Sequence, residues 1–318
     1  MIETLPESAA QPPVHHEGVP DRLRAVKKRT PTVIKLAARR GLRRVGLATA
    51  GHRVLPSYLV IGTKRGGTTS LVNWLFAHPE VMPLFPAAQQ IKSPHYFDIN
   101  YWRGEDWYRS HFPTRRRVER WTKRLGHPPA VGEASPYYLF HPAVPGRVAA
   151  TVPDVKVVVL LRDPVKRAYS NYWERRGSNA EDLPTFEQAL AAEPARLAPV
   201  TRQLLDDPRF YSHDHDCHSY LARGRYLEQL QPWLAAFDRE QLLVLRSEDL
   251  YADPRATYAR VQEFLGLTVH DADRLEHHHK LPVPPMLPET RQMLADYYRP
   301  HNQALSEALG IDFGWSSS

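Results

Sequence analysis

Residues 58–75 read Tyr58-Leu-Val-Ile-Gly-Thr-Lys-Arg-Gly-Gly-Thr-Thr-Ser-Leu-Val-Asn-Trp-Leu75. The apolar run from Leu59 to Ile61 is typical of a strand buried on both faces. The glycines that follow let the backbone curl, so that successive N–H groups point into one concavity. Hydroxyl side chains then stand at a helix start, where the dipole and free N–H groups attract an anion. The segment predicts a strand, a phosphate-type anion loop and a helix.

The loop departs from the nucleotide P-loop pattern, G-x-x-x-x-G-K-[ST]. Gly62 and Gly67 have the required spacing, but Thr68 stands where the pattern has Lys. The cations Lys64 and Arg65 precede the second glycine instead. Because the missing Lys would bind the β- and γ-phosphates, the loop is a poor match for nucleoside triphosphate hydrolysis.

A second strand and helix are predicted around Lys156-Val-Val-Val-Leu-Leu161, which Arg162 follows directly. Pro164 suits the first position of a helix, with Asp163 as its cap. Arg162 lies at the carboxyl end of the strand, where open α/β sheets bind ligands. Ser170 can face back toward it, and an Arg with a Ser suits a terminal phosphate monoester.

Together the two segments resemble the sulfotransferases that use 3′-phosphoadenosine-5′-phosphosulfate (PAPS). Thr63 to Leu71 is similar to the family's 5′-phosphosulfate loop, and Arg162 to Tyr172 is similar to its 3′-phosphate motif. The resemblance extends over about Pro56 to Trp315. Other segments resemble the branch of heparan sulfate sulfotransferases and bacterial homologues: Lys92-Ser-Pro-His-Tyr-Phe-Asp98, Gly132-Glu-Ala-Ser-Pro-Tyr-Tyr138, Leu245-Arg-Ser-Glu-Asp-Leu250, Glu289-Thr-Arg and Tyr297-Tyr-Arg-Pro-His-Asn302.

The resemblance implies an α/β fold: a single P-loop-like domain over residues 56–315, with a central parallel sheet flanked by helices on both faces. A third buried strand is predicted at Leu242–Arg246, followed by a helix at Pro254–Leu265 that ends at Gly266. A long terminal helix is predicted at Pro288–Leu309, interrupted near Pro300 and ended by Gly310. Strands that alternate with helices in this way agree with the implied fold. The resemblance also implies transfer of the sulfuryl group from PAPS to an acceptor hydroxyl, with 3′,5′-ADP as the leaving product and no metal. The cofactor-binding residues it implies are Arg65, Gly66, Gly67, Thr68, Thr69, Ser70, Arg162, Ser170 and Lys280.

The catalytic cation differs from the family pattern. Aligned on the Gly-Thr-Thr that follows, Arg65 stands where the family has a lysine that neutralises the bridging oxygen. Arginine supplies the charge but does not give up a proton. We expect Arg65 to take this role, because a register shifted by one would move the glycines as well. Lys64, reaching in from the neighbouring position, is the alternative.

The general base differs too. Ser93 stands where heparan-sulfate-type enzymes place a Glu, and a serine cannot accept the acceptor's proton at neutral pH. His95 is the expected substitute, since an unperturbed pKa of about 6.5 suits a general base. Glu133 is the second candidate, and a structural role for His95 stays open. Ala134 stands where some relatives carry a lysine, so one acceptor contact is missing.

Two histidine-rich segments could be mistaken for metal sites. His277-His-His-Lys280 stands where relatives close a loop over the nucleotide, and we interpret it as a solvated or nucleotide-facing loop. His213-Asp-His-Asp-Cys-His218 has one thiol and no C-x-x-C partner, which disfavours zinc. We expect this second segment to line the acceptor side.

Charge is concentrated at the N-terminus. Residues 1–50 carry ten Lys/Arg against four Asp/Glu, so they account for +6 of the net +7 of the 318-residue chain. The rest is near neutral, which argues against a nucleic-acid-binding protein. Residues 1–50 are predicted to be a basic arm, disordered or partly helical. Residues 22–48 could contact an anionic membrane peripherally, with a merely solubilising arm as the alternative.

The hydropathy, cysteine content and charge of the chain predict its compartment and its acceptor. No apolar run reaches a membrane span, no signal-peptide core is present, and the single Cys217 fits a reducing cytoplasm. A near-neutral globular part favours a small molecule, glycoside or glycolipid over a glycosaminoglycan. Rival functions are a P-loop kinase or NTPase, and a PAPS-binding protein that has lost catalysis. Core positions and an aromatic wall for the acceptor are expected among Tyr96, Phe97, Tyr101, Trp102, Trp107, Tyr108, Phe112, Trp121, Tyr137 and Tyr138.

Overall fold

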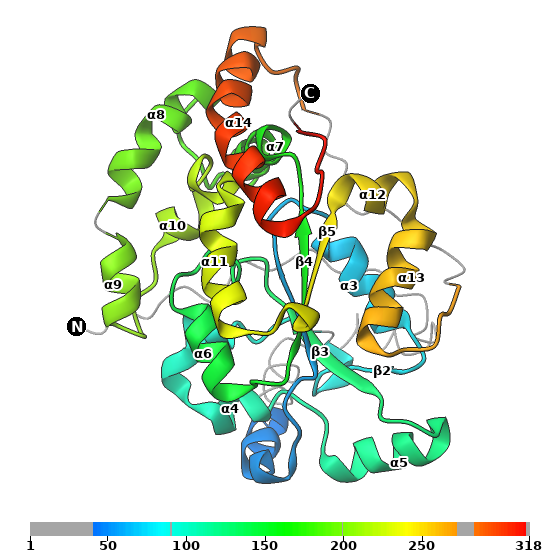
Figure 1. Cartoon of the computed structure of the whole chain (residues 1–318). Helices are drawn as coiled ribbons and strands as arrows, with labels where there is room; N and C mark the ends of the chain where they lie inside the picture. Colours follow the sequence, from blue (N-terminus) through cyan, green and yellow to red (C-terminus); the bar gives the residue numbers. More distant parts are fainter. Residues whose placement is uncertain (1–40, 90, 199, 272–282, 316–318) are drawn as a thin grey trace, which may run out of the picture.

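A computed structural model of the chain describes residues 41–89, 91–198, 200–271 and 283–315. Five parallel strands form one sheet in the order β2-β3-β1-β4-β5 (Figure 1). Their bounds are Tyr58–Gly62 (β1), Val81–Met82 (β2), Ala130–Ala134 (β3), Lys156–Leu161 (β4) and Leu242–Arg246 (β5). Strand β1 is central. The chain first adds β2 and β3 on one side of β1 and then adds β4 and β5 on the other side. The crevice at such a switch point is where ligands bind in α/β sheets.

Helices follow most strands. They are α3 (Thr68–Ala77), α4 (Glu105–Arg109), α5 (Arg115–Leu125), α6 (Val144–Thr151), α7 (Pro164–Gly177), α8 (Phe186–Leu197), α9 (Val200–Asp206), α10 (His213–Cys217), α11 (Tyr226–Ala236), α12 (Ser247–Ala252), α13 (Pro254–Leu265) and α14 (Pro288–Leu309). None of the described helices is long and apolar enough to cross a membrane. The predicted fold, a parallel sheet with helices on both faces, is confirmed.

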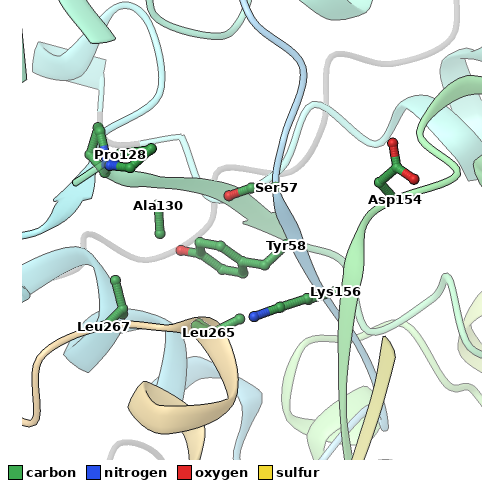
Figure 2. A pocket seen from close by; sticks show the side chains of 9 residues that line it. Ser57, Tyr58, Pro128, Ala130, Asp154, Lys156, Leu265 and Leu267 are labelled. Carbon is green, nitrogen blue, oxygen red and sulfur yellow. The ribbon is translucent and has the colours of Figure 1, made fainter. Parts of the chain in front are cut away.

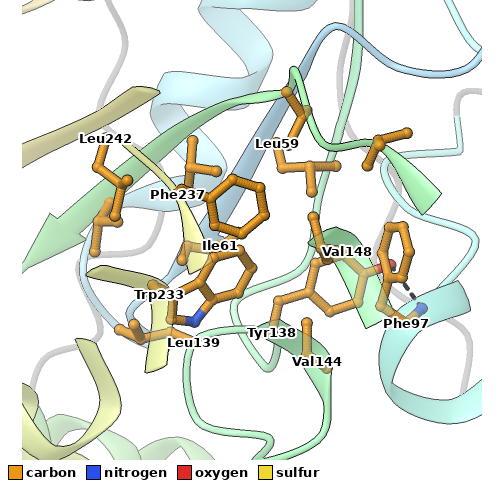
Figure 3. Packing of buried hydrophobic residues seen from close by; sticks show 14 of the residues in the cluster. Leu59, Ile61, Phe97, Tyr138, Leu139, Val144, Val148, Trp233, Phe237 and Leu242 are labelled. Atoms are coloured by element: carbon orange, nitrogen blue, oxygen red, sulfur yellow. Dashed lines mark hydrogen bonds between the residues drawn. The ribbon is translucent and has the colours of Figure 1, made fainter. Parts of the chain in front are cut away.

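Each face of the sheet carries its own hydrophobic core. Side chains alternate along β1, so that Leu59 and Ile61 enter one core while Tyr58 and Val60 enter the other. Figure 3 shows the first core, in which α6 and α11 pack on the sheet and Trp233 lies among the strand residues. Helices α3 and α13 cover the opposite face. Burial on both faces explains why the central strands read as continuous apolar runs.

Two of the five strands escaped sequence prediction. Strand β2 has only two residues, and β3 reads Ala-Val-Gly-Glu-Ala, which contains one β-branched residue. In β3, Gly132 pairs with Tyr58, and a Cβ on Gly132 would lie 2.5 Å from the Tyr58 ring and from its carbonyl oxygen. Packing against β1 therefore selects glycine here, although glycine alone disfavours a strand.

Helix α14 runs without a break through Pro300, where the sequence predicted an interruption. Proline removes only its own N–H from the helical ladder and clashes with one preceding carbonyl. The buried side chains on either side, Leu294, Tyr298 and Leu305, keep the helix packed against the domain. Tertiary packing outweighs the local cost of the proline.

Residues 41–50 lie on the domain, although the sequence assigned them to a separate arm. Residues 41–48 are helical, and Gly46 is buried so closely that a Cβ would lie 2.9 Å from the Ser110 carbonyl oxygen. Leu42, Val45 and Leu47 on the same helix are exposed at 37, 52 and 42%. Residues 1–40 lie outside the described part of the chain.

A cavity of about 250 Å³ lies at the amino-terminal edge of the sheet (Figure 2). Tyr58, Ala130 and Lys156, the first residues of three strands, contribute to its lining, together with Leu265 and Leu267. It therefore lies at the edge opposite to the β1–α3 loop and is separate from the predicted anion site.

Gly132→Ala tests the close approach of β3 to β1. We expect the free energy of unfolding to fall by about 1–3 kcal/mol, the usual cost of overpacking, because a backbone oxygen cannot move aside. Gly146→Ala is the matched control: it lies in α6 with no atom within 4 Å of the added Cβ, so stability should stay the same or rise. Chemical denaturation measures both variants. Equal stability of the two would contradict the packing described here.

Candidate active site

The loop between β1 and α3 turns through two residues with left-handed backbone. Arg65 has a φ of 70° and Gly67 a φ of 89°. Glycine suits the second position because a Cβ there would also lie 3.0 Å from the Tyr251 hydroxyl. The Ser247 hydroxyl, at the carboxyl end of β5, donates a hydrogen bond to the Gly66 carbonyl. The loop backbone is thus fixed from a neighbouring strand.

The loop opens helix α3 in a way that suits an anion. Gly67 is the residue before the first turn and provides no side-chain cap, while its carbonyl oxygen accepts from the N–H groups of Ser70 and Leu71. Thr68, Thr69 and Ser70 form that first turn, and Thr69 is half-buried while the other two are buried. Uncapped N–H groups and a helix dipole form an anion-binding position.

The two predicted cofactor motifs meet at this edge of the sheet. The Arg65 Nε donates a hydrogen bond to the Ser170 hydroxyl at 3.0 Å. The Arg162 Nη1 donates to the Arg65 carbonyl oxygen at 2.9 Å. Asp163 caps α7 by accepting from the backbone N–H groups of Val165 and Lys166, as predicted. The structure therefore brings Arg65, Arg162 and Ser170 into one cluster.

Burial lowers the pKa of Arg65; the charge of Glu174 opposes this shift, and that of Arg162 adds to it. Arginine nevertheless stays charged at any working pH.

Lys64 points away from this cluster. Its Nζ donates to the Asp216 carbonyl oxygen at 2.9 Å and lies 3.3 Å from the Asp216 Oδ1. Arg223, which is 1% exposed, contacts the same carboxylate at 3.2 Å. Burial raises the pKa of Asp216, but Lys64 and Arg223 outweigh it, so that the pKa lies well below its usual range. Lys64 is thus one partner of a buried charge network.

His95 forms a pair with Asp98. The His95 Nδ1 donates to the Asp98 Oδ2 at 2.9 Å, and the Ser135 hydroxyl donates to the same oxygen at 2.9 Å. Burial lowers the pKa of His95, but the charge and hydrogen bond of Asp98, with smaller effects of Asp216 and Glu133, raise it to about 9. The imidazole is therefore protonated at neutral pH.

Glu133 lies at the end of β3 and has no exposed surface. Its Oε1 accepts hydrogen bonds from the Tyr108 hydroxyl at 2.7 Å and the Tyr138 hydroxyl at 3.0 Å, and its Oε2 accepts from the Ser93 hydroxyl. Burial raises the pKa of Glu133 to about 7, against the opposite effect of these three donors. Of the two predicted bases, Glu133 has the better pKa for accepting a proton near pH 7.

The remaining predicted residues fall into two groups. Lys280 and the adjacent histidines lie outside the described residues. In the second histidine segment, the His215 Nδ1 lies 2.9 Å from the Tyr137 hydroxyl, and its ring stacks on Phe140. His218 contacts Asp214. Within the described ranges, no group of three or more His, Cys, Asp or Glu is arranged to bind a metal ion.

Most of the predicted aromatic wall lies in the core. Seven of the ten side chains named above are buried, and Tyr101 and Trp121 are half-buried. Trp102 alone among the ten is exposed, at 45%, with Arg103 stacked 4.3 Å from its ring centroid and Arg209 at 5.6 Å. The sequence missed the partners Asp98, Ser135, Asp216 and Arg223. Only Asp98, three residues after His95, carried a local signal.

Comparison with known proteins identifies the family. The sequence model described as "Sulfotransferase domain" matches residues 55–283. Heparan sulfate glucosamine 3-O-sulfotransferase 3A1 of Mus musculus is 30% identical over 293 residues, covering 85% of this chain and 66% of that protein. Membrane-associated sulfotransferase kil1 of Dictyostelium discoideum is 26% identical, covering 83% of this chain and 67% of that protein. This chain therefore spans about two thirds of the length of both relatives.

A solved structure agrees with these matches. The sulfotransferase from Alicyclobacillus acidocaldarius superposes with a TM-score of 0.63 at 26% identity, covering 83% of this chain and 100% of that one. The chain belongs to the family of PAPS-dependent sulfotransferases. Its fold is the family's P-loop-like α/β fold.

Substitution of the two loop cations tests their roles. Arg65→Ala should lower sulfuryl-transfer turnover by about 100- to 1,000-fold, the scale for losing one donor of transition-state charge stabilisation. Lys64→Ala should lower turnover far less, because Lys64 is paired with Asp216. Labelled-sulfate transfer from PAPS measures both. If the Lys64 variant lost its turnover while the Arg65 variant kept nearly normal turnover, the assigned register would be wrong.

Proposed function

We propose that this protein transfers the sulfuryl group of PAPS to an acceptor hydroxyl. The observation that carries the proposal is the meeting of two anion sites at one edge of the sheet, where Arg65 contacts Ser170 and Arg162 contacts the Arg65 carbonyl. PAPS carries a phosphosulfate on its 5′ side and a phosphate on its 3′ side, so it needs two such sites. Family membership supports the same activity.

Each motif has a part in binding PAPS. Backbone N–H groups of residues 66–70 and the hydroxyls of Thr68 and Thr69 bind the 5′-phosphosulfate. Arg162 and Ser170 bind the 3′-phosphate, with Lys280 as a further ligand. The cations of the chain supply the neutralising charge, so the proposal includes no metal.

Arg65 serves both sides of the nucleotide. Its guanidinium now contacts Ser170, on the 3′-phosphate side. When the 3′-phosphate binds the Ser170 hydroxyl, the Arg65 guanidinium loses its contact with Ser170. It then moves to the bridging oxygen of the phosphosulfate. There it stabilises the negative charge that develops on the leaving phosphate. The S–O bond to that phosphate breaks as the acceptor oxygen forms its own S–O bond, and 3′,5′-ADP leaves.

For the acceptor we propose a hydroxyl on a neutral small molecule, glycoside or glycolipid. The cations Lys64, Arg223 and His95 are paired with Asp216 and Asp98, so they offer less charge to a polyanionic acceptor than unpaired cations would. A compact basic run, Arg115-Arg-Arg117, begins helix α5. It follows directly from a bridge between Thr114 and Arg53, near the amino end of β1. It is therefore far from the strand ends that form the site. Relatives named for heparan sulfate glucosamine make that polysaccharide the alternative acceptor.

We also propose a cytoplasmic protein whose residues 22–48 contact a membrane peripherally. Exposed Leu42, Val45 and Leu47 lie on one short helix with Arg43 and Arg44, the combination typical of interfacial helices. One relative is named as membrane-associated. The single cysteine supports a reducing compartment.

Calorimetry with 3′,5′-ADP tests the proposed activity. We expect saturable binding without magnesium, because the ligands are backbone amides, hydroxyls and arginines. Arg162→Ala should weaken binding by about 10- to 100-fold through loss of one charged contact. Binding of Mg-ATP with no response to 3′,5′-ADP would favour the rival kinase or NTPase. Tight binding of 3′,5′-ADP without any labelled-sulfate transfer would indicate a PAPS-binding protein that has lost catalysis.

An acceptor screen tests the second part. Labelled PAPS is offered with heparan-type oligosaccharides, small glycosides, phenols and liposome-bound glycolipids, to the full chain and to a chain that lacks residues 1–40. We expect sulfation of neutral acceptors, and loss of activity on the liposome-bound acceptor alone after truncation. Sulfation of the polysaccharide alone would overturn the proposed acceptor. Unchanged activity on liposomes after truncation would remove the membrane role.

A further inference from the structure

Glu133 is a fully buried carboxylate whose hydrogen-bonding partners are all hydroxyl groups. Tyr108 and Tyr138 donate to one oxygen and Ser93 donates to the other. A buried carboxylate is costly unless hydrogen bonds compensate it. These three hydrogen bonds would also suffice for a purely structural carboxylate. Glu133 takes part in the reaction only if one of the three donors connects it to the acceptor.

Ser93 is the donor that solvent reaches. Both tyrosines are 0% exposed, whereas Ser93 is half-buried. The Ser93 oxygen also accepts a hydrogen bond from the His95 backbone N–H at 2.9 Å. The Tyr138 hydroxyl also interacts with Ser93 but donates its own proton to Glu133. Because a hydroxyl has one donor and two acceptor positions, Ser93 can therefore accept one hydrogen bond beyond that from His95. An acceptor hydroxyl can occupy that position.

The Ser93 turn lies beside the cofactor loop. His95, two residues after Ser93, is close enough to Asp216 for that carboxylate to raise the pKa of His95. Asp216 in turn binds Lys64 of the loop. Strands β3 and β1, which end at Ala134 and Gly62, are hydrogen-bonded neighbours. Ser93, Glu133 and the loop therefore belong to the same edge of the sheet.

We propose that Ser93 relays the acceptor's proton to Glu133, so that the two residues together form the general base. The inference rests on the proposed sulfuryl transfer. As the acceptor oxygen attacks sulfur, its proton passes to the Ser93 oxygen while the Ser93 proton passes to the Glu133 Oε2. The bridging S–O electrons leave with 3′,5′-ADP. Glu133 returns the proton to solvent through Ser93 after the products have left.

His95 has another part in this scheme. With a pKa of about 9 it carries a proton at neutral pH and cannot accept a second one. Its backbone N–H instead orients Ser93, and its cationic ring contacts Asp98 and interacts electrostatically with Asp216. His95 is therefore a positioning residue, and the predicted choice between His95 and Glu133 falls on Glu133.

A double-mutant cycle tests the relay. With labelled PAPS and water as acceptor, turnover is read as released inorganic sulfate. Ser93→Ala and Glu133→Gln should each lower it by about 100-fold, the lower range for a general base. Because both residues act on one proton, the double variant should be no slower than either single variant. Independent, multiplying losses would overturn the relay.

The pH profile distinguishes a relay from a structural role. Wild-type turnover should rise with pH through about 7, where Glu133 loses its proton, and then level off. Ser93→Thr retains the hydroxyl and should retain this rise of turnover through pH 7, the acidic limb of the profile. Ser93→Ala should lose it. Ser57→Ala is the control, because Ser57 binds the Val131 backbone at the other end of β3 and should leave the profile unchanged. A limb near pH 7 that persists in Ser93→Ala would overturn the proposal.

Two further measurements separate this inference from the proposed function. Binding of 3′,5′-ADP by calorimetry should be equal in wild type and Ser93→Ala; absent binding in both would contradict sulfuryl transfer itself. Infrared titration of wild type against Glu133→Gln reads the carboxyl proton without turnover. Ser93→Ala should raise the pKa of Glu133 further, because a donor that stabilises the carboxylate is lost. A Glu133 that stays protonated above pH 9 would exclude it as a base.

Discussion

The hydrogen bond from Arg162 to the Arg65 carbonyl oxygen joins the ends of the two central strands. It fixes the left-handed turn at Arg65, and the Ser247 bond to the next carbonyl fixes the same turn from β5. Residues at the carboxyl ends of three parallel strands thereby contact one another, at the point where the order of the sheet changes direction. Everything proposed for PAPS depends on this geometry, since it holds two anion sites at a fixed separation.

Charge pairing distinguishes the residues that act as fixed charges from the residue that can exchange a proton. Lys64, Asp216 and Arg223 form one network, and His95 with Asp98 forms a second. In the first, Lys64 and Arg223 stabilise the charged form of Asp216, and in the second, Asp98 stabilises the charged form of His95. Glu133 differs, because its partners are neutral hydroxyls and its burial raises its pKa to about 7. A group near its pKa exchanges protons readily, whereas groups far from theirs act as fixed charges.

Sequence alone predicted the parts of the fold that local chemistry encodes. Strand β5 and helix α13 were placed with the bounds observed, because a short apolar run and a helix with Pro at its start and Gly after its end are local signals. Strand β3 and the continuity of α14 were missed, because packing against Tyr58 and around Pro300 decides them. Likewise the sequence named Arg65, Arg162 and Ser170, which the structure brings together, but it assigned no partner to Asp216. Asp216 lies 152 positions from Lys64, and only the folded chain brings these two together.

A crystal structure of the protein with 3′,5′-ADP would test the central claim most directly. We expect the 5′-phosphate to lie against the backbone N–H groups of residues 66–70, and the 3′-phosphate to lie within hydrogen-bond distance of Arg162 and Ser170. We also expect the Arg65 guanidinium to have left Ser170 for the 5′ side. A nucleotide bound elsewhere, for example in the cavity beside Tyr58, with the β1–α3 loop empty and Arg65 still on Ser170, would contradict it.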